Sequence, residues 1–319
     1  MRRVSRFIAL SIAIVVLAAA CGSGSGSSDG AASNARLARI SSAADGVADA
    51  STGRFSMDLV YEGLPDPGGV AISGEGEYDL DNDASRFTMD MVAMLEGAPG
   101  APPEFDGSME TITMGSIIYM SGSFFGAIPG FDAEWISFDI EQAAEEAGLD
   151  GIDLDSLMHN QGVGPSATLD QLKALDSIEE VGTEEVRGVA TTHYSGEVRL
   201  GDAFDELDET QRDAVAGLYG SDLDAAADMV VPFDVWVDED GLVRRIVQSI
   251  SGDDLAASIE SGGLEDADKV EGGSITTTVE YFDIGADISI EAPAGAIDLS
   301  ELMSATFNFG HTIPGAGEN

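Results

Sequence analysis

Alternation of apolar and polar residues with a period of two, repeated in segment after segment, restricts the fold of this chain most. Phe55, Met57, Leu59 and Tyr61 occupy every second position, which is typical of a strand with one buried face. Because the predicted strands follow one another, mostly through hairpin turns, we expect antiparallel pairing and an α+β fold built on one strongly curved sheet. Further strands are predicted over 70–80, 86–95, 109–120, 135–140, 179–186, 189–200, 233–237, 242–251, 274–282 and, briefly, 288–290.

Helical patterns precede and interrupt these strands. Residues 35–50 carry apolar side chains near helical spacing, which predicts an amphipathic helix ahead of the first strand. The long strand predicted over 109–120 is expected to bend at Gly115. Helical or irregular structure is expected over 141–176, and helices over 202–219 and 222–229.

The N-terminus has the features of a secretory signal peptide. Arginines cluster in the first six residues, and the apolar run 7–20 is too short to span a bilayer comfortably as a permanent helix. Leu17-Ala18-Ala19-Ala20-Cys21 resembles the lipobox of bacterial lipoproteins, in which the cysteine is lipidated and begins the mature chain. A plain signal peptide or a single-pass anchor is the alternative. We therefore divide the chain into a signal peptide (1–20), a lipidated Cys21 with a flexible Gly/Ser tether (21–34), one α+β domain (35–310) and a loose tail (311–319).

The charge balance limits the partners. The chain has 59 acidic and 14 basic residues and a formal net charge of -45. A surface this anionic repels nucleic acid, so no nucleic-acid partner is expected.

Cys21 is the single cysteine, so no intrachain disulfide can form. We expect a monomer on the extracytoplasmic face of the cell membrane, held there by its N-terminal lipid.

No motif in the sequence calls for catalysis or for a cofactor. The histidines, His159, His193 and His311, stand in unrelated contexts, and zinc-binding spacings are missing. His193, between Thr192 and Tyr194 on a predicted strand, is expected to be structural rather than catalytic. We therefore expect no enzyme, no metal site and no cofactor.

Several segments of the chain occur in a characteristic order: the lipobox, the helix leading into Phe55-Ser56-Met57, 186–196 (VRGVATTHYSG), 233–250 (FDVWVDEDGLVRRIVQSI) and 279–293 (VEYFDIGADISIEAP). In this order they resemble the LppX/LprAFG-type actinobacterial lipoproteins, which are related in fold to the LolA/LolB lipoprotein carriers. This chain has apparent insertions near 96–107 and 253–272 and is unusually acidic.

The resemblance implies a half-barrel, in which a curved antiparallel sheet wraps over α-helices and encloses an apolar cavity for acyl chains. Members of the family bind or carry lipids and lipoglycans between the plasma membrane and the outer envelope. The partners implied here are a lipid or glycolipid ligand and an envelope protein.

Methionines concentrate in the first predicted strands, and this is the one feature of the residues themselves that favours a lipid cavity. Methionine is flexible and polarizable and suits a surface that accommodates varied apolar ligands. A packed core with methionine as filler explains the cluster equally well. The candidate lining residues are Phe55, Met57, Phe87, Met89, Met91, Ile112, Met114, Ile118 and Met120. Phe124, Phe125 and Phe131 are candidates for the cavity mouth, or they simply cover the core.

The leading hypothesis is an anchored lipoprotein that shields acyl chains in an apolar cavity during lipid transfer or envelope assembly. The alternative is a regulatory or adaptor module of the same fold that binds a protein partner. Because the body is strongly negative, a bound lipid is expected to have a neutral or sugar headgroup, or to meet a basic spot such as Arg244-Arg245.

Overall fold

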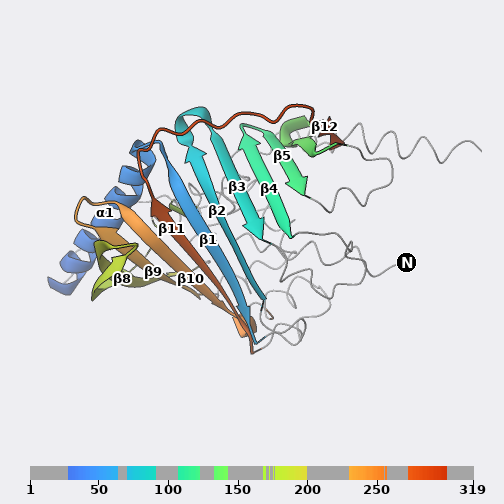
Figure 1. The fold of residues 1–319 in the computed structure, drawn as a ribbon. Helices are drawn as coiled ribbons and strands as arrows, with labels where there is room; N and C mark the ends of the chain where they lie inside the picture. The colour runs from blue at the N-terminus through green and yellow to red at the C-terminus, as the bar shows by residue number, and fades with distance from the viewer. Residues whose placement is uncertain are drawn as a thin grey trace, which may run out of the picture.

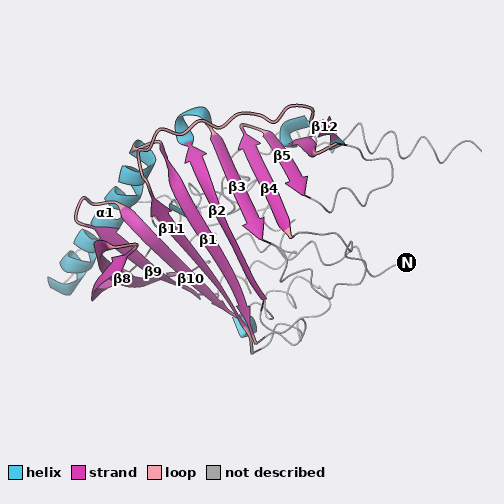
Figure 2. Cartoon of the chain, in the orientation of Figure 1, coloured by secondary structure: helices cyan, strands magenta, loops and turns pink. Residues whose placement is uncertain are grey.

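The computed structural model describes residues 28–63, 70–90, 107–122, 133–142, 177–199, 230–254 and 272–299, together with 168, 169, 172, 175 and 256. Over these ranges the chain forms one open, curved sheet of twelve strands (Figures 1 and 2). All neighbouring strands pair antiparallel except β12, which pairs parallel to β6. The prediction of a single, mostly antiparallel curved sheet is therefore confirmed.

The spatial order of the strands is β12-β6-β5-β4-β3-β2-β1-β11-β10-β9-β8-β7. Strands β1 to β6 form one half as successive neighbours, and β11 returns to pair with β1 and joins this half to the hairpins β7–β8 and β9–β10. The bounds are β1 Thr52–Glu62, β2 Val70–Asp79, β3 Ala84–Asp90, β4 Ser108–Met114, β5 Ile117–Gly122, β6 Trp135–Asp139, β7 Ser177–Val186, β8 Val189–Arg199, β9 Val230–Asp238, β10 Val243–Ser251, β11 Ser274–Phe282 and β12 Ile297–Asp298.

Two strand predictions are wrong. The strand expected over 109–120 is a hairpin, because Gly115 has a positive φ of 55° and turns the chain between β4 and β5 instead of bending it. Residues 288–290 are not a strand. Ile288 and Ile290 pack onto a face of the sheet, and the chain joins the sheet edge only afterwards, as β12.

Helix α1 (Ser28–Asp49) begins seven residues before the predicted start, so the end of the predicted tether is helical. Alanines at 31 and 32 are strong helix formers, and they extend the helix backwards into the Gly/Ser-rich segment. In Figure 1 α1 lies at the left, and it contacts β7, β9 and β10. The predicted helices over 202–219 and 222–229 lie outside the described residues, so wrapping of the sheet over several helices is not confirmed.

The face of the sheet that α1 covers is called here the inner face, and the opposite face the outer face. Ile40, Ala44 and Val47 of α1 are buried in one cluster with apolar side chains from β7 to β11 and from β1 to β3, and the helix itself contacts β7, β9 and β10. The main core therefore lies on the inner face. At about 25 cal/mol for each Å² of apolar surface buried, this core is the main source of stability.

A second, smaller core lies on the outer face. After β11 the chain crosses towards the far edge of the sheet, along the top of Figure 1. It is fixed at its start because Gly285 donates a backbone hydrogen bond to the Thr52 carbonyl at 2.7 Å. Ile288 and Ile290 then cover Ile112. Within the described residues, no helix is both long enough and apolar enough to cross a membrane.

Candidate functional site

Two glycines of β2, Gly74 and Gly76, leave space on the inner face of the sheet that two phenylalanine rings fill. A Cβ on Gly76 would lie 2.7 Å from the Phe55 ring, and a Cβ on Gly74 would lie 2.5 Å from the Phe87 ring. The rings occupy the space that side chains on β2 would take, and they stack with centroids 5.4 Å apart and planes 12° apart. The inner face over β2 is therefore covered by the rings of Phe55 and Phe87, which are called here the Phe55–Phe87 floor.

Apolar side chains that are only half-buried flank this floor. Met57, Leu59 and Tyr61 follow Phe55 on the inner side of β1, and Met89 follows Phe87 on β3. All four pack against the main core and remain partly exposed. Burial raises the pKa of the Tyr61 phenol, so the far end of this row is already shielded from water. The arrangement offers an apolar surface to a flexible apolar ligand.

Six of the nine candidate lining residues share the inner face. Pairing of Met57 with Gly74, and of Gly74 with Met89, brings the first methionines onto one row across three strands. Met120 packs with Ile136 further along the same face. The candidates on the inner face are Phe55, Met57, Phe87, Met89, Ile118 and Met120.

Ile112 and Met114 lie on the outer face and do not share a surface with the other candidates. They pair with Arg86 and Ala84 of β3, one residue out of phase with Phe87. Both belong to the outer core under Ile290, and Ile112 is 1% exposed. Met91, Phe124, Phe125 and Phe131, like Cys21, lie outside the described residues.

Four residues that shape this surface, Gly74, Gly76, Leu59 and Tyr61, are not among the candidates that the sequence pattern predicts. The pattern over 70–80 predicts only a strand at Gly74 and Gly76, and the alternation over 55–61 predicts only a buried strand face at Leu59 and Tyr61. A Gly-x-Gly pair inside a strand pattern marks a close approach of another group, and this was the available signal.

Three other residues named from the sequence, His193, Arg244 and Arg245, are held by carboxylates. His193 stacks on Trp236 with ring centroids 4.2 Å apart, and its Nε2 lies 2.7 Å from an oxygen of Asp234. The proposed basic spot is neutralised, since Arg244 pairs with Asp238 at 2.6 Å and Arg245 pairs with a glutamate of β11. It therefore offers little charge to an anionic headgroup.

Fold and site together define an open antiparallel sheet with one apolar, partly exposed face. No family model matches the chain. An uncharacterized 31.2 kDa protein of Streptomyces griseus, from the rplA-rplJ intergenic region, is 27% identical over 184 residues, which are 57% of this chain. The match covers 52% of that relative, so the chain spans about half the length of the curated protein it matches.

Solved structures of the expected kind are similar to the chain. LprF from Mycobacterium bovis is 13% identical with a TM-score of 0.41, covering 82% of this chain and 99% of that one. The Mycobacterium tuberculosis lipoprotein LppX is 15% identical with a TM-score of 0.40, covering 81% and 99%. A LolA superfamily protein from Nitrosomonas europaea is 7% identical with a TM-score of 0.23, covering 79% and 94%. These structures are of the LppX/LprF and LolA-like kinds that the sequence resemblance named.

Proposed function

We propose that the chain is an extracytoplasmic lipoprotein, anchored to the cell membrane through Cys21, that binds lipid acyl chains on the inner face of its sheet for transfer or envelope assembly. In this proposal the sheet is a half-barrel that wraps over helices and closes an apolar chamber. The observation that carries the proposal is the row of half-buried apolar side chains beside the Phe55–Phe87 floor.

The physical basis is the difference between this row and an ordinary core. Phe55 is 1% exposed, whereas Met57, Leu59 and Tyr61 on the same face of the same strand keep part of their surface open. Covering apolar surface stabilises by about 25 cal/mol per Å², and each acyl methylene buried contributes about 0.8 kcal/mol. Methionine and leucine side chains adapt to chains of different length and saturation.

A charge placed on the inner face tests the proposal. We expect Leu59→Asp to reduce non-covalently bound lipid at least tenfold, because an aspartate on an apolar surface must either lose its hydration or hold water where the acyl chain would lie. The full chain is purified in detergent from membranes of its native host. Lipid is then extracted with organic solvent and quantified per mole of protein by mass spectrometry.

Val60→Asp is the matched control, since Val60 is the next residue of β1 and faces outward with Ala71 and Thr276 as its partners. It adds the same charge to the same strand and should leave the bound lipid unchanged. Absence of stoichiometric lipid from the unmodified chain would defeat the proposal, as would equal loss in both variants while circular dichroism shows both to be folded.

The anchor has its own test. Mass spectrometry of the N-terminal peptide is expected to find a mature chain that begins at Cys21 and carries a diacylglyceryl thioether. A mature N-terminus at another residue, or an unmodified Cys21, would contradict the anchor and leave the lipid-binding proposal standing.

A further inference from the structure

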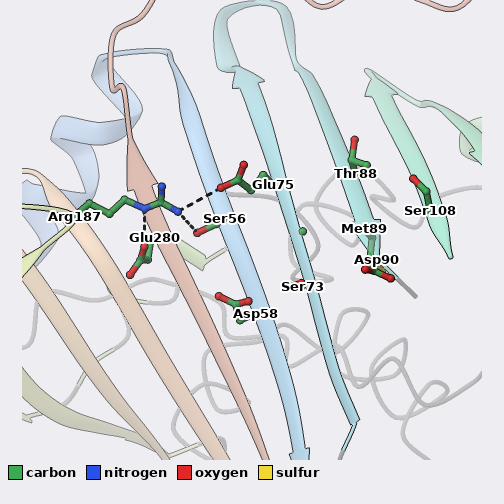
Figure 3. A pocket seen from close by; sticks show the side chains of 11 residues that line it. Ser56, Asp58, Ser73, Glu75, Thr88, Met89, Asp90, Ser108, Arg187 and Glu280 are labelled. Atoms are coloured by element: carbon green, nitrogen blue, oxygen red, sulfur yellow. Dashed lines mark hydrogen bonds and ion pairs between the residues drawn. The ribbon is translucent and has the colours of Figure 1, made fainter. Parts of the chain in front are cut away.

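A polar cavity of about 550 Å³ opens on the outer face, over β1 to β4 (Figure 3). Pockets for small molecules in proteins have volumes of roughly 300–1,000 Å³. Except for Gly74 and Met89, which belong to the inner face, its lining residues on β1 to β3 lie on the face opposite the Phe55–Phe87 rings, so the cavity is distinct from the proposed lipid site. Its lining residues are Ser56, Asp58, Ser73, Gly74, Glu75, Thr88, Met89, Asp90, Ser108, Arg187 and Glu280.

Hydroxyl and carboxylate side chains alternate across the floor of this cavity. The register aligns Ser56 of β1 with Glu75 of β2, and Glu75 with Thr88 of β3. The next row begins with Asp58 opposite Ser73. Asp90 and Ser108 continue this second row on β3 and β4, so each carboxylate stands beside hydroxyls on the neighbouring strands.

One wall of the cavity is Arg187, from the turn between β7 and β8. Its Nη2 donates to Ser56 Oγ at 3.0 Å and lies 3.6 Å from a Glu75 oxygen, and its Nε donates to Glu280 at 2.7 Å. The guanidinium also lies 4.0 Å from the centre of the Phe282 ring. Figure 3 shows the contacts of Arg187 with Ser56, Glu75 and Glu280. With the Phe282 ring, these contacts from β1, β2 and β11 hold the guanidinium at the cavity edge.

We propose that this cavity is a second ligand site and that it binds a neutral saccharide. Serine and threonine hydroxyls donate and accept, carboxylates accept, and a guanidinium donates, so the lining can pair with the hydroxyl groups of a sugar in both directions. Four lining carboxylates against one guanidinium exclude an anionic ligand. The near absence of apolar side chains excludes an acyl chain.

A metal ion fits this site less well. The carboxylates stand on separate strands with hydroxyls between them, and among the described residues no three His, Cys, Asp or Glu side chains gather closely enough to hold a metal. The spacing between neighbouring strands, about 4.8 Å, distributes the polar groups over an extended ligand rather than around a point.

Binding of neutral disaccharides to the full chain tests the site. Maltose, cellobiose and lactose are titrated by NMR and calorimetry in a sugar-free polyoxyethylene detergent, and at least one is expected to bind in the millimolar range. We expect Ser73→Leu, which fills the cavity, and Thr88→Val, which keeps the volume but removes a hydroxyl, to weaken it at least tenfold. Thr183→Leu, on the exposed edge strand β7, is the matched control and should bind as the unmodified chain does.

Two probes separate saccharide recognition from general attraction to an acidic protein. 1,4-Diaminobutane carries charge without hydroxyls and should not shift the NMR resonances of the residues that line the cavity. A disaccharide with a uronic acid should bind at least tenfold more weakly than its neutral counterpart. No binding by any neutral disaccharide, equal binding of the uronic acid form, or equal loss in Thr183→Leu would overturn the proposal. None of these outcomes bears on lipid binding at the inner face.

Discussion

Phe55→Ala is expected to lower the free energy of unfolding by about 3–5 kcal/mol, the range observed when a buried aromatic ring is truncated. The ring is 1% exposed, stacks on Phe87 and lies 6.5 Å from the Tyr78 ring. Below it is the bare backbone of Gly76, so no side chain from β2 can move into the space that the ring leaves. The loss therefore combines the transfer energy with a cavity that cannot collapse.

Urea unfolding of the variants and the unmodified chain measures this effect. Phe55→Leu is the matched control, because it keeps most of the apolar volume and should cost less than about 1.5 kcal/mol. If alanine cost no more than leucine, the space left by the ring would collapse despite the bare backbone of Gly76, and the prediction would be wrong.

The strands could be predicted because their pattern is local. Alternation over 54–62 and over 242–251 is read from neighbouring residues, and β1 and β10 lie where the alternation places them. Turn chemistry is equally local when several turn residues occur together, as they do at 238–241 between β9 and β10. A lone Gly115 gives no such sign, so the pattern predicts one bent strand where the structure has a hairpin.

The face of each side chain was harder to predict, because it depends on phase. A shift of one residue along a strand moves a side chain to the opposite face. The sequence pattern groups Phe87 with Ile112, but the register pairs Phe87 with Thr111 and turns Ile112 outward. Apolar character alone could not reveal this, since the chain after β11 covers an apolar patch on the outer face as well.

Contacts between segments that are far apart in the chain cannot be predicted from the sequence pattern. Arg187 lies 93 residues from Glu280 and 131 from Ser56, and it reaches both only because the sheet curves and the β7–β8 turn lies over β11 and β1. In the sequence this arginine is a turn residue before a glycine. Its role as a wall of the outer cavity is a consequence of tertiary structure.

Glu280→Gln is expected to lower the free energy of unfolding by about 2–4 kcal/mol at neutral pH, because it removes a shared anion from between two guanidinium groups. Glu280 accepts from Arg187 Nε at 2.7 Å and from Arg245 Nε at 2.8 Å, and its side chain is 15% exposed. Glutamine keeps the shape but has one neutral acceptor for two cations. Asp283→Asn is the matched control, since its pair with Arg54 is exposed on both sides and should be worth less than about 1 kcal/mol.

The pH dependence of stability gives the same prediction an independent readout. Burial opposes ionisation of Glu280, but the hydrogen bonds and charges of Arg187 and Arg245 outweigh it and hold the pKa below the ordinary value of 4.5. A group with a depressed folded-state pKa adds stability above its unfolded-state pKa and loses it as the pH falls through the folded-state value. Unfolding followed from neutral pH to below 4.5 should therefore show the unmodified chain losing its advantage over Glu280→Gln. A constant difference between the two chains across that range would show that Glu280 is not ionised between its arginines, because only a carboxylate whose protonation is linked to folding makes the difference depend on pH.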